Sequence, residues 1–271
     1  MQNNGSGQPL RIVQFTDTHF FGASDGRLMG VDTSDTFRQV LHLSLEQRGT
    51  PDLYLLTGDL SQDETGESYR RLARALTVLE APAYFLPGNH DKRGVMHDAF
   101  EQSPADIRPD KVIVSGDWLI VMLDTLVENE VGGRLEQDQL DLLDEALQAN
   151  PDKHALVCMH HHPVPVGAAW LDGICVENSE DFWRVADRHE NVRAVLWGHI
   201  HQQFDGMRNQ VKLMASPSTC VQFEPRTEDF SLDRAAPGYR WLELRNDGTV
   251  QSSVERVREL AAGLDYQSEG Y

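Results

Sequence analysis

Short apolar runs alternate with helix-like patterns over the first third of the chain. Strand-like runs cover residues 10–16, 53–56 and 83–86. Between them, residues 33–48 and 65–80 carry apolar side chains at the 3.6-residue spacing of an amphipathic helix. This strand–helix–strand–helix–strand order predicts parallel strand pairing with helices packed on the sheet.

The middle and end of the chain add further predicted elements. Residues 112–114 and 119–123 lie on either side of Ser115-Gly116-Asp117, which predicts a hairpin. A helix is predicted at residues 135–149 and another near 181–188, with strands at 154–159 and 192–197. The remaining predicted strands cover residues 211–214, 219–223, 239–244 and 250–256, and Asn246-Asp247-Gly248 is a hairpin turn signal between the last two.

The chain shows neither an internal repeat nor a linker rich in Pro, Gly and Ser, which predicts one domain. We expect residues 1–9 to form a flexible N-terminus, residues 10–256 a single domain, and residues 257–271 a C-terminal tail. The predicted fold class is α/β (α+β): two packed mixed sheets with helices outside.

Composition narrows the function classes. The chain has 24 Lys and Arg against 43 Asp and Glu, a net charge of −19, so it lacks the basic footprint that binding of long nucleic acids requires. It contains no apolar run long enough to span a bilayer, and its polar first residues lack the regions of a signal peptide. We therefore expect no membrane partner, a cytoplasmic location, and a monomer or a homodimer. Cys158, Cys175 and Cys220 have no metal-type spacing and form no disulfide framework.

Five of the strand-like runs end in residues that commonly bind metals. The motifs are Asp17-Thr18-His19, Gly58-Asp59, Gly88-Asn89-His90-Asp91, His160-His161-His162 and Gly198-His199-Ile200-His201. Each motif alone is a weak signal, because Asp-x-His or Gly-Asp usually marks a turn. In open α/β sheets, however, sites form beyond the carboxyl ends of the strands, and all five motifs lie there.

Together these residues predict a two-metal hydrolytic centre. Asp17 and His19 can face one ion, the two oxygens of Asp59 can bridge two cations, and Asn89 offers a neutral amide oxygen. His160, His199 and His201 offer imidazole nitrogens. A mixed oxygen and nitrogen set without thiolate suits two divalent ions, with Fe or Mn expected and Zn or Co as alternatives.

Such a centre suits an anionic phosphodiester. Two divalent cations, two carboxylates and one hydroxide leave the centre net positive within an acidic protein, and the two ions can hold the attacking hydroxide between them. His90 and Asn89, neighbours on the same turn, are the predicted catalytic residues, and His90 is expected to contact the phosphate and donate a proton to the leaving oxygen. Asp63 is a candidate for orienting His90. His161 and His162 are expected to lie behind the ligands or at the surface, because three consecutive histidines cannot all face one centre.

The five motifs, in this order over about residues 10–205, resemble the calcineurin-like metallophosphoesterases. The resemblance implies a four-layer sandwich of two β-sheets flanked by helices. It also implies two ligand sets that share Asp59: Asp17, His19, Asp59 and His201 for one metal, and Asp59, Asn89, His160 and His199 for the other.

A narrower resemblance extends over nearly the whole chain. The segments from His160 to Pro165, from Ala169 to Asp172, from Pro217 to Phe223 and from Pro237 to Trp241 resemble the bacterial class III 3′,5′-cyclic-AMP phosphodiesterases. This implies hydrolysis of cyclic AMP to 5′-AMP by a metal-bridging hydroxide. Two alternatives stay open: another small-molecule phosphodiesterase, acting on a glycerophosphodiester or a nucleotide pyrophosphate, and a non-catalytic scaffold that keeps the fold.

Overall fold

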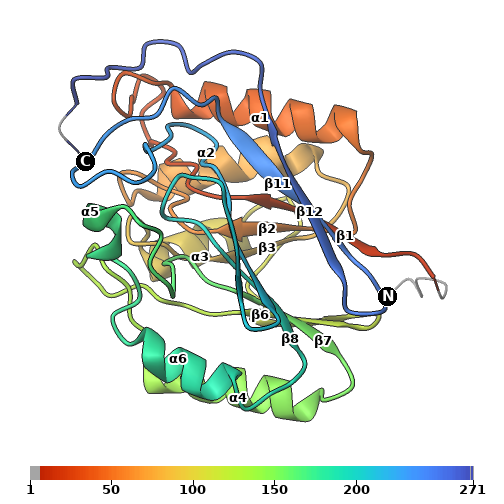
Figure 1. Ribbon diagram of the computed structural model, residues 1–271. Helices are drawn as coiled ribbons and strands as arrows, with labels where there is room; N and C mark the ends of the chain where they lie inside the picture. The colour runs from red at the N-terminus through yellow and green to blue at the C-terminus, as the bar shows by residue number, and fades with distance from the viewer. Residues whose placement is uncertain (1–6, 269, 271) are drawn as a thin grey trace.

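The structure is a computed structural model that describes residues 7–268 and 270. Most of the predicted flexible N-terminus, residues 1–6 of 1–9, therefore lies outside the described residues. Figure 1 shows the order of helices and strands along the chain. The strands are β1 (Leu10–Phe15), β2 (Leu53–Thr57), β3 (Ala83–Leu86), β4 (Ile107–Arg108), β5 (Val112–Ser115), β6 (Trp118–Met122), β7 (His154–Cys158), β8 (Val192–Trp197), β9 (Phe204–Arg208), β10 (Val211–Ala215), β11 (Gly238–Leu244) and β12 (Val250–Arg256). The helices are α1 (Thr33–Gln47), α2 (Gly66–Ala75) followed by the 3-10 turn η1 (Leu76–Val78), α3 (Arg93–Glu101), α4 (Gln137–Ala149), α5 (Ala169–Asp172) and α6 (Ser179–Ala186).

The strands form two mixed sheets of six strands each. The first has the order β12-β11-β1-β2-β3-β4, in which β1 to β4 are parallel and β11 runs antiparallel to β1. The second has the order β5-β6-β7-β8-β10-β9, in which β6, β7, β8 and β10 are parallel. The parallel pairing predicted for the first third of the chain is thus confirmed.

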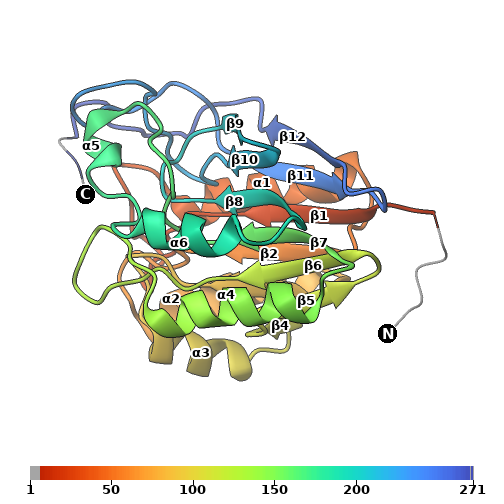
Figure 2. The ribbon, with the colours of Figure 1, turned by 60° about the horizontal axis from the view of Figure 1, so that its bottom comes forward.

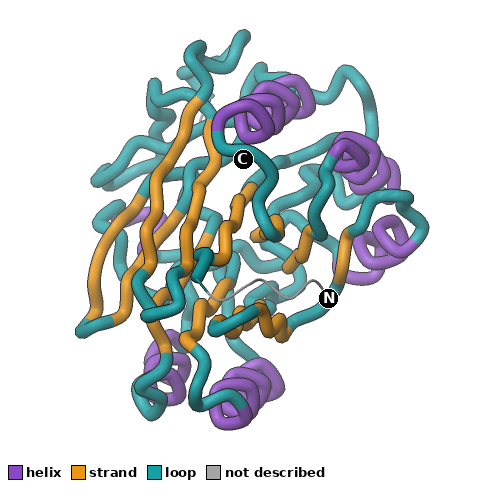
Figure 3. Tube along the Cα trace, turned by 90° about the vertical axis from the view of Figure 1, so that its right-hand side faces the viewer, coloured by secondary structure: helices purple, strands orange, loops and turns teal. Residues whose placement is uncertain are grey.

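The two sheets pack face to face with helices on their outer faces. Along β1 the side chains alternate: Ile12 lies in the core between the sheets, and Val13 packs under the outer helices with Phe37 of α1 and Leu72 of α2. On the other side, α4 and α6 cover the second sheet through residues such as Leu143. Figures 1 and 3 show these layers, with helices on two opposite sides of the strands. The predicted α/β sandwich is confirmed.

One predicted strand is wrong. Residues 219–223 form no strand, and Phe223 makes only an isolated bridge with Leu232. The backbone donors of this segment bond to other loops: Thr219 N–H donates to Thr16, and Phe223 N–H to the carbonyl of His201. Residues 219–223 therefore form a loop over the strand ends, although their residue types are common in strands.

Several elements were not predicted, namely α3, α5, β4 and β9. The two predicted hairpins are confirmed, because Ser115 pairs with Trp118, and Gly248, with φ of +85°, closes the turn between β11 and β12. Within the described residues, no helix has the length and apolar character needed to cross a bilayer. Part of the predicted tail packs on the domain, since Asp265 N–H donates to the carbonyl of Met29 over 2.9 Å.

The carboxyl ends of the parallel strands meet at one edge of the sandwich, at the left of Figure 2. The two sheets are linked there directly: the Nδ1 atom of His160, just after β7, lies 2.8 Å from the carbonyl oxygen of Thr57 at the end of β2. The loops after β1, β2, β3, β7 and β8 thus share one location, which carries the predicted metal ligands.

Candidate metal centre

The seven predicted metal ligands come together at this edge, from five different loops. Asp17 and His19 follow β1, Asp59 follows β2, Asn89 follows β3, His160 follows β7, and His199 and His201 follow β8. All except the partly exposed Asn89 are buried. Residues remote in the sequence therefore form one compact donor set.

Asp17, His19, Asp59 and His201 form one group, with ligand atoms within 4.8 Å of one another. The Nε2 atom of His201 lies 3.2 Å from Nε2 of His19 and 3.4 Å from Oδ1 of Asp17. The Oδ2 atom of Asp59 lies 3.8 Å from Nε2 of His19. These four residues are the set that the family resemblance implied for one metal.

His160 and His199 form the second group, together with Asn89 and Asp59. The Nε2 atom of His160 lies 3.2 Å from Oδ1 of Asn89 and 3.3 Å from Oδ2 of Asp59. Ring nitrogens of His160, His161 and His199 lie within 4.8 Å of one another, so His161 also borders this group. Asp59 Oδ2 is therefore the atom that faces both groups.

The backbone is strained where it presents these ligands. Five of the seven residues, Asp17, His19, Asp59, His199 and His201, have φ between +45° and +63°. This left-handed conformation is uncommon for residues other than glycine and costs on the order of 1–3 kcal/mol each. Such strain is typical of functional sites, where the surrounding structure holds a chain segment in the geometry that its side chains need.

Hydrogen bonds from the protein orient the histidines. The Nδ1 atom of His160 faces the Thr57 carbonyl, that of His201 faces the Val221 carbonyl at 2.8 Å, and that of His19 faces Oε1 of Gln62 at 2.6 Å. Each of these rings therefore donates from Nδ1 and directs Nε2 towards the other ligands. Outer contacts of this kind are the usual means of fixing the tautomer of a metal-binding histidine.

The charges of the centre are strongly coupled. Burial opposes ionisation of Asp59, but His160 and His90 hold its pKa well below the usual range. Burial alone would lower the pKa of His160, whereas the charges of Asp59 and Asp17 raise it to about 9. Burial lowers the pKa of His19 to about 3 and also lowers that of His199, which is surrounded by other histidines. Most of the imidazoles with resolved shifts are thus kept neutral, the form in which they bind metals.

The donor set fits two divalent cations. Asp59 Oδ2 and both ring nitrogens of His199 are buried and accept or donate no hydrogen bond. Buried polar atoms without partners are costly and rare, so these atoms call for a ligand. Because the set contains carboxylate, amide and imidazole donors but no thiolate, it suits borderline metal ions.

Asp91, to which the sequence assigned no role, holds two of the loops together. Its carboxylate accepts hydrogen bonds from the backbone N–H groups of Leu60, Ser61 and Gly88 and from the hydroxyl of Tyr69. Burial and the charge of Asp59 raise the pKa of Asp91 to about 7. This residue therefore fixes the loop that carries Asp59 relative to the loop that carries Asn89 and His90.

His90 lies at the open side of the centre, and its backbone N–H donates to Oδ1 of Asp59 over 2.9 Å. The carboxylate of Asp63, the sequence candidate for orienting His90, accepts hydrogen bonds from Gly22 and Thr65 and thereby fastens the loop before α2. The side chain that reaches His90 is Gln62, with Nε2 at 3.5 Å from Nδ1 of His90. Gln62 is absent from the predicted site because a glutamine in the loop between β2 and α2 carries no distinctive sequence signal.

His161 and His162 are both buried, which rules out the surface position that the sequence left open for them. His161 joins the centre to a neighbouring loop: its Nδ1 lies 2.8 Å from the Thr125 hydroxyl and its Nε2 lies 3.1 Å from the Val131 carbonyl. Both of its ring nitrogens therefore bond to the loop. The Nε2 atom of His162 lies 3.8 Å from Oδ1 of Asp172, and burial lowers the pKa of His162 to about 4.

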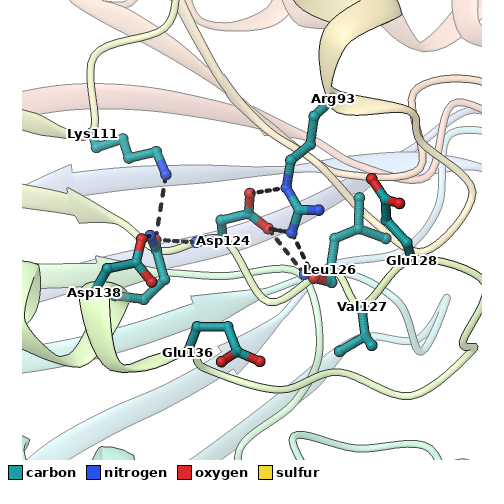
Figure 4. A pocket seen from close by; sticks show the side chains of 9 residues that line it. Arg93, Lys111, Asp124, Leu126, Val127, Glu128, Glu136 and Asp138 are labelled. Atoms are coloured by element: carbon teal, nitrogen blue, oxygen red, sulfur yellow. Dashed lines mark hydrogen bonds and ion pairs between the residues drawn. The ribbon is translucent and has the colours of Figure 1, made fainter.

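A cavity of about 250 Å³ opens beside Asn89 and His90. Its other lining residues come from Glu64, from the start of α3 and from the loop after β6: Asp91, Lys92, Arg93, Leu126, Glu128, Asn129, Glu130 and Val131. Arg93 also lines a neighbouring cavity of about 480 Å³, where its guanidinium donates to both carboxylate oxygens of Asp124 and to the Leu126 carbonyl (Figure 4). Arg93 thus fixes the loop that forms one wall of the cavity at His90.

Comparisons with known proteins agree with this geometry. The model of the calcineurin-like phosphoesterase family matches residues 10–203. A 3′,5′-cyclic adenosine monophosphate phosphodiesterase from Pseudomonas aeruginosa is 42% identical over 260 residues, covering 96% of this chain and 94% of the relative. The protein of the same name from Escherichia coli strain K12 is 39% identical over 263 residues, covering 97% and 95%.

The fold also occurs in solved structures. A dimetal phosphatase from Danio rerio is 15% identical and has a TM-score of 0.61, covering 92% of this chain and 99% of that one. At this identity the likeness concerns the fold alone. Together with the family model and the sequence relatives, it leads to one conclusion: the chain belongs to the calcineurin-like phosphoesterase family.

Proposed function

We propose that this chain hydrolyses 3′,5′-cyclic AMP to 5′-AMP with two divalent metal ions. The observation that carries the proposal is the complete donor set beside His90, buried except for Asn89, in a chain that is 42% identical over nearly its whole length to a cyclic-AMP phosphodiesterase. The cavity of about 250 Å³ is at the small end for ligand sites, which favours a small diester over a polymer.

The residues named above would hold the metals in two sets that share Asp59. Fe or Mn is the proposed metal, with Zn or Co as alternatives, because all four accept mixed carboxylate and imidazole donors. When bound, two such ions lower the pKa of water and neutralise charge on a phosphoryl group.

The protein's own residues do the remaining work. Asp59 and Asp17 are anchored by backbone N–H groups, so the ligands are in place before substrate arrives. Asn89 contributes its amide oxygen, which faces His160. We assign to His90 the donation of a proton to the departing 3′ oxygen, since His90 lies next to Asn89 and lines the cavity.

The test is hydrolysis of cyclic AMP by protein loaded with Mn²⁺ or Fe²⁺, with 5′-AMP and 3′-AMP separated in the product. We expect 5′-AMP alone, and an Asp59→Asn preparation made in parallel excludes a contaminating enzyme. Comparing kcat/KM for cyclic AMP, cyclic GMP, a glycerophosphodiester and bis(4-nitrophenyl) phosphate tests specificity. A large preference for another diester would favour the alternative phosphodiesterase, and no hydrolysis of any diester would favour a non-catalytic scaffold.

The cytoplasmic location and the monomeric or homodimeric state stay predictions. Size-exclusion chromatography with light scattering tests the oligomeric state directly.

A further inference from the structure

Residues 126–131, the wall segment, form one side of the cavity at His90. The wall residues that line this cavity are Leu126, Glu128, Asn129, Glu130 and Val131. Within the segment the Glu130 N–H donates to the Val127 carbonyl over 3.1 Å, so its backbone forms a turn. The guanidinium of Arg93 donates to the Leu126 carbonyl and thereby holds the first end of the segment (Figure 4).

The second end of the wall segment is held by His161. Its Nε2 lies 3.1 Å from the Val131 carbonyl oxygen, and its Nδ1 lies 2.8 Å from the Thr125 hydroxyl. A carbonyl oxygen can only accept, so Nε2 carries the proton. Burial and the charge of His160 hold the pKa of His161 well below its usual range, and the neutral ring therefore accepts from Thr125 at Nδ1. The Thr125 hydroxyl in turn accepts from the backbone N–H of His161 over 3.3 Å.

The same ring packs against two ligands of the second metal group. Its centroid lies 4.5 Å from that of His199 and 4.9 Å from that of His160. Because both ring nitrogens of His161 bond to the loop, the ring supports these two ligands from behind and does not complete the donor set. The loop approaches His161 closely at Gly133, where a Cβ atom would overlap the ring. His161 is thus wedged between the second metal group and the loop that carries the wall segment.

We propose that His161 is a positioning residue that couples the second metal position to the wall segment. When His160 and His199 bind a cation, their rings are fixed, and His161, packed against both, then holds the Val131 carbonyl in one place. Order in the wall segment therefore depends on bound metal, and substrate affinity depends on His161. The second consequence rests on the proposed function, because it requires a substrate that enters this cavity.

Two substitutions of His161 separate its two hydrogen bonds. The amide of glutamine reaches the position of Nε2 and can donate to the Val131 carbonyl, whereas the amide of asparagine reaches only the position of Nδ1. We expect His161→Asn to raise KM for cyclic AMP about 3–10-fold, the effect of one lost hydrogen bond, with kcat and bound metal nearly unchanged. His161→Gln should restore most of the natural KM. The same KM in both variants would overturn the inference.

A second pair of variants tests the contact from the other side, since a change at a buried histidine can prevent folding. Thr125→Val keeps the shape of threonine but removes the hydroxyl that bonds to Nδ1, whereas Thr125→Ser keeps the hydroxyl. KM should rise in Thr125→Val and stay near the natural value in Thr125→Ser. Ser44→Ala is the matched control, because it removes a buried hydroxyl that donates to the Leu41 carbonyl within α1, and it should leave KM unchanged.

Hydrogen–deuterium exchange provides a readout that needs no substrate. The amides of Gly133 and Arg134 donate to the Cys175 and Thr125 carbonyls, and their exchange reports opening of the loop. Loading chelator-treated protein with Zn²⁺ should slow exchange over residues 126–134 in the natural chain and in His161→Gln. It should slow exchange much less in His161→Asn and Thr125→Val, with metal content measured in each sample.

Equal slowing by Zn²⁺ in the natural chain and in all these variants would overturn the coupling. Because this measurement contains no nucleotide, failure of the inference is distinguishable from failure of the proposed function.

Discussion

The Oδ2 atom of Asp59 lies 3.3 Å from the Nε2 atom of His160, and it is buried without a hydrogen-bond partner. The same oxygen lies 3.8 Å from Nε2 of His19, in the other ligand group. One carboxylate oxygen thus faces both groups. The Oδ1 atom of Asp17 lies farther from the second group, at 4.0 Å from Nε2 of His160, and 3.4 Å from Nε2 of His201 in the first.

Removing the charge of Asp59 should empty both metal positions. In Asp59→Asn the bridging oxygen becomes part of a neutral amide, and the coupling between the two groups is lost. Metal analysis after gel filtration should show that bound metal and cyclic AMP turnover fall together. The control is Asp63→Asn, a charge loss four residues away that should retain the metal. Full metal content in Asp59→Asn would exclude the bridging role.

Replacing His90 by alanine should separate catalysis from metal binding. The backbone N–H of His90 donates to Asp59, and alanine keeps that group. We expect unchanged metal content and a loss of about 10²–10⁴ in cyclic AMP turnover, the usual contribution of a side chain that acts on a reacting proton. A His90→Ala enzyme as active as the natural chain would remove His90 from the mechanism.

The fold and the clustering of the candidate ligands could be predicted because both depend on local patterns. A buried parallel strand appears in the sequence as an apolar run, and ligands appear as Asp, Asn or His at its end, as in Gly58-Asp59 after β2. Parallel strands with helical crossovers place such ends at one edge of a sheet, which brings the loops of Asp17 and Asp59 together. The meeting of Asp17 with His199 also requires the two sheets to pack with these edges aligned.

The rest of the site depends on contacts that no local pattern encodes. Gln62 and Asp63 are neighbours in the sequence, and only the path of the loop decides which of them reaches His90. Residues 219–223 have a strand-like composition, but their backbone donors bond to the ligand loops. Helix α3 begins two residues after Asp91, where the sequence suggested only the end of a motif.

Metal binding should release at least about one proton per chain near neutral pH. Because the pKa of His160 is raised to about 9 by Asp59 and Asp17, its ring is protonated at pH 7, and a cation can bind Nε2 only after the proton leaves. Apparent metal affinity should therefore rise about tenfold per pH unit and level off near pH 9. Isothermal titration calorimetry in buffers of different ionisation enthalpy counts the protons, and a count of zero would contradict the assignment.

The raised pKa of His160 also makes the stability of the metal-free fold depend on pH. A raised pKa means that the Asp59–His160 ion pair stabilises the metal-free fold fully below the ordinary value of 6.5, and that this contribution disappears as pH rises through about 9. Chemical unfolding of chelator-treated protein at several pH values measures it.

The rim of the cavity at His90 should disfavour highly charged phosphates. Glu64, Glu128 and Glu130 line it, and of the two cations there, Arg93 is paired with Asp124. Neutralising Glu128 and Glu130 to glutamine should lower the inhibition constant of dianionic 5′-AMP several-fold, an effect of at most about 1 kcal/mol per charge that salt weakens. Glu46→Gln with Glu145→Gln, on exposed faces of α1 and α4, is the control for net charge. Equal effects from both pairs would mean that the charge of the whole protein, and not the rim, sets the inhibition.

Adding a side chain at Gly198 should lower metal affinity and stability, whereas adding one at a glycine in a helix should not. A Cβ atom at this position would overlap the Thr16 hydroxyl and lie 2.8 Å from Oδ2 of Asp17, the carboxylate that accepts the His199 N–H. Gly198→Ala should therefore displace Asp17, lower metal affinity by at least about tenfold, and destabilise the fold by about 1–3 kcal/mol. Gly94→Ala in α3 is the matched control: beyond the adjacent residues and the helix backbone, no atom lies within 4 Å of its Cβ position, so stability should rise by about 0.5–1 kcal/mol with metal affinity unchanged. Urea unfolding and metal titration measure both variants, and wild-type metal affinity in Gly198→Ala would show that Asp17 tolerates displacement.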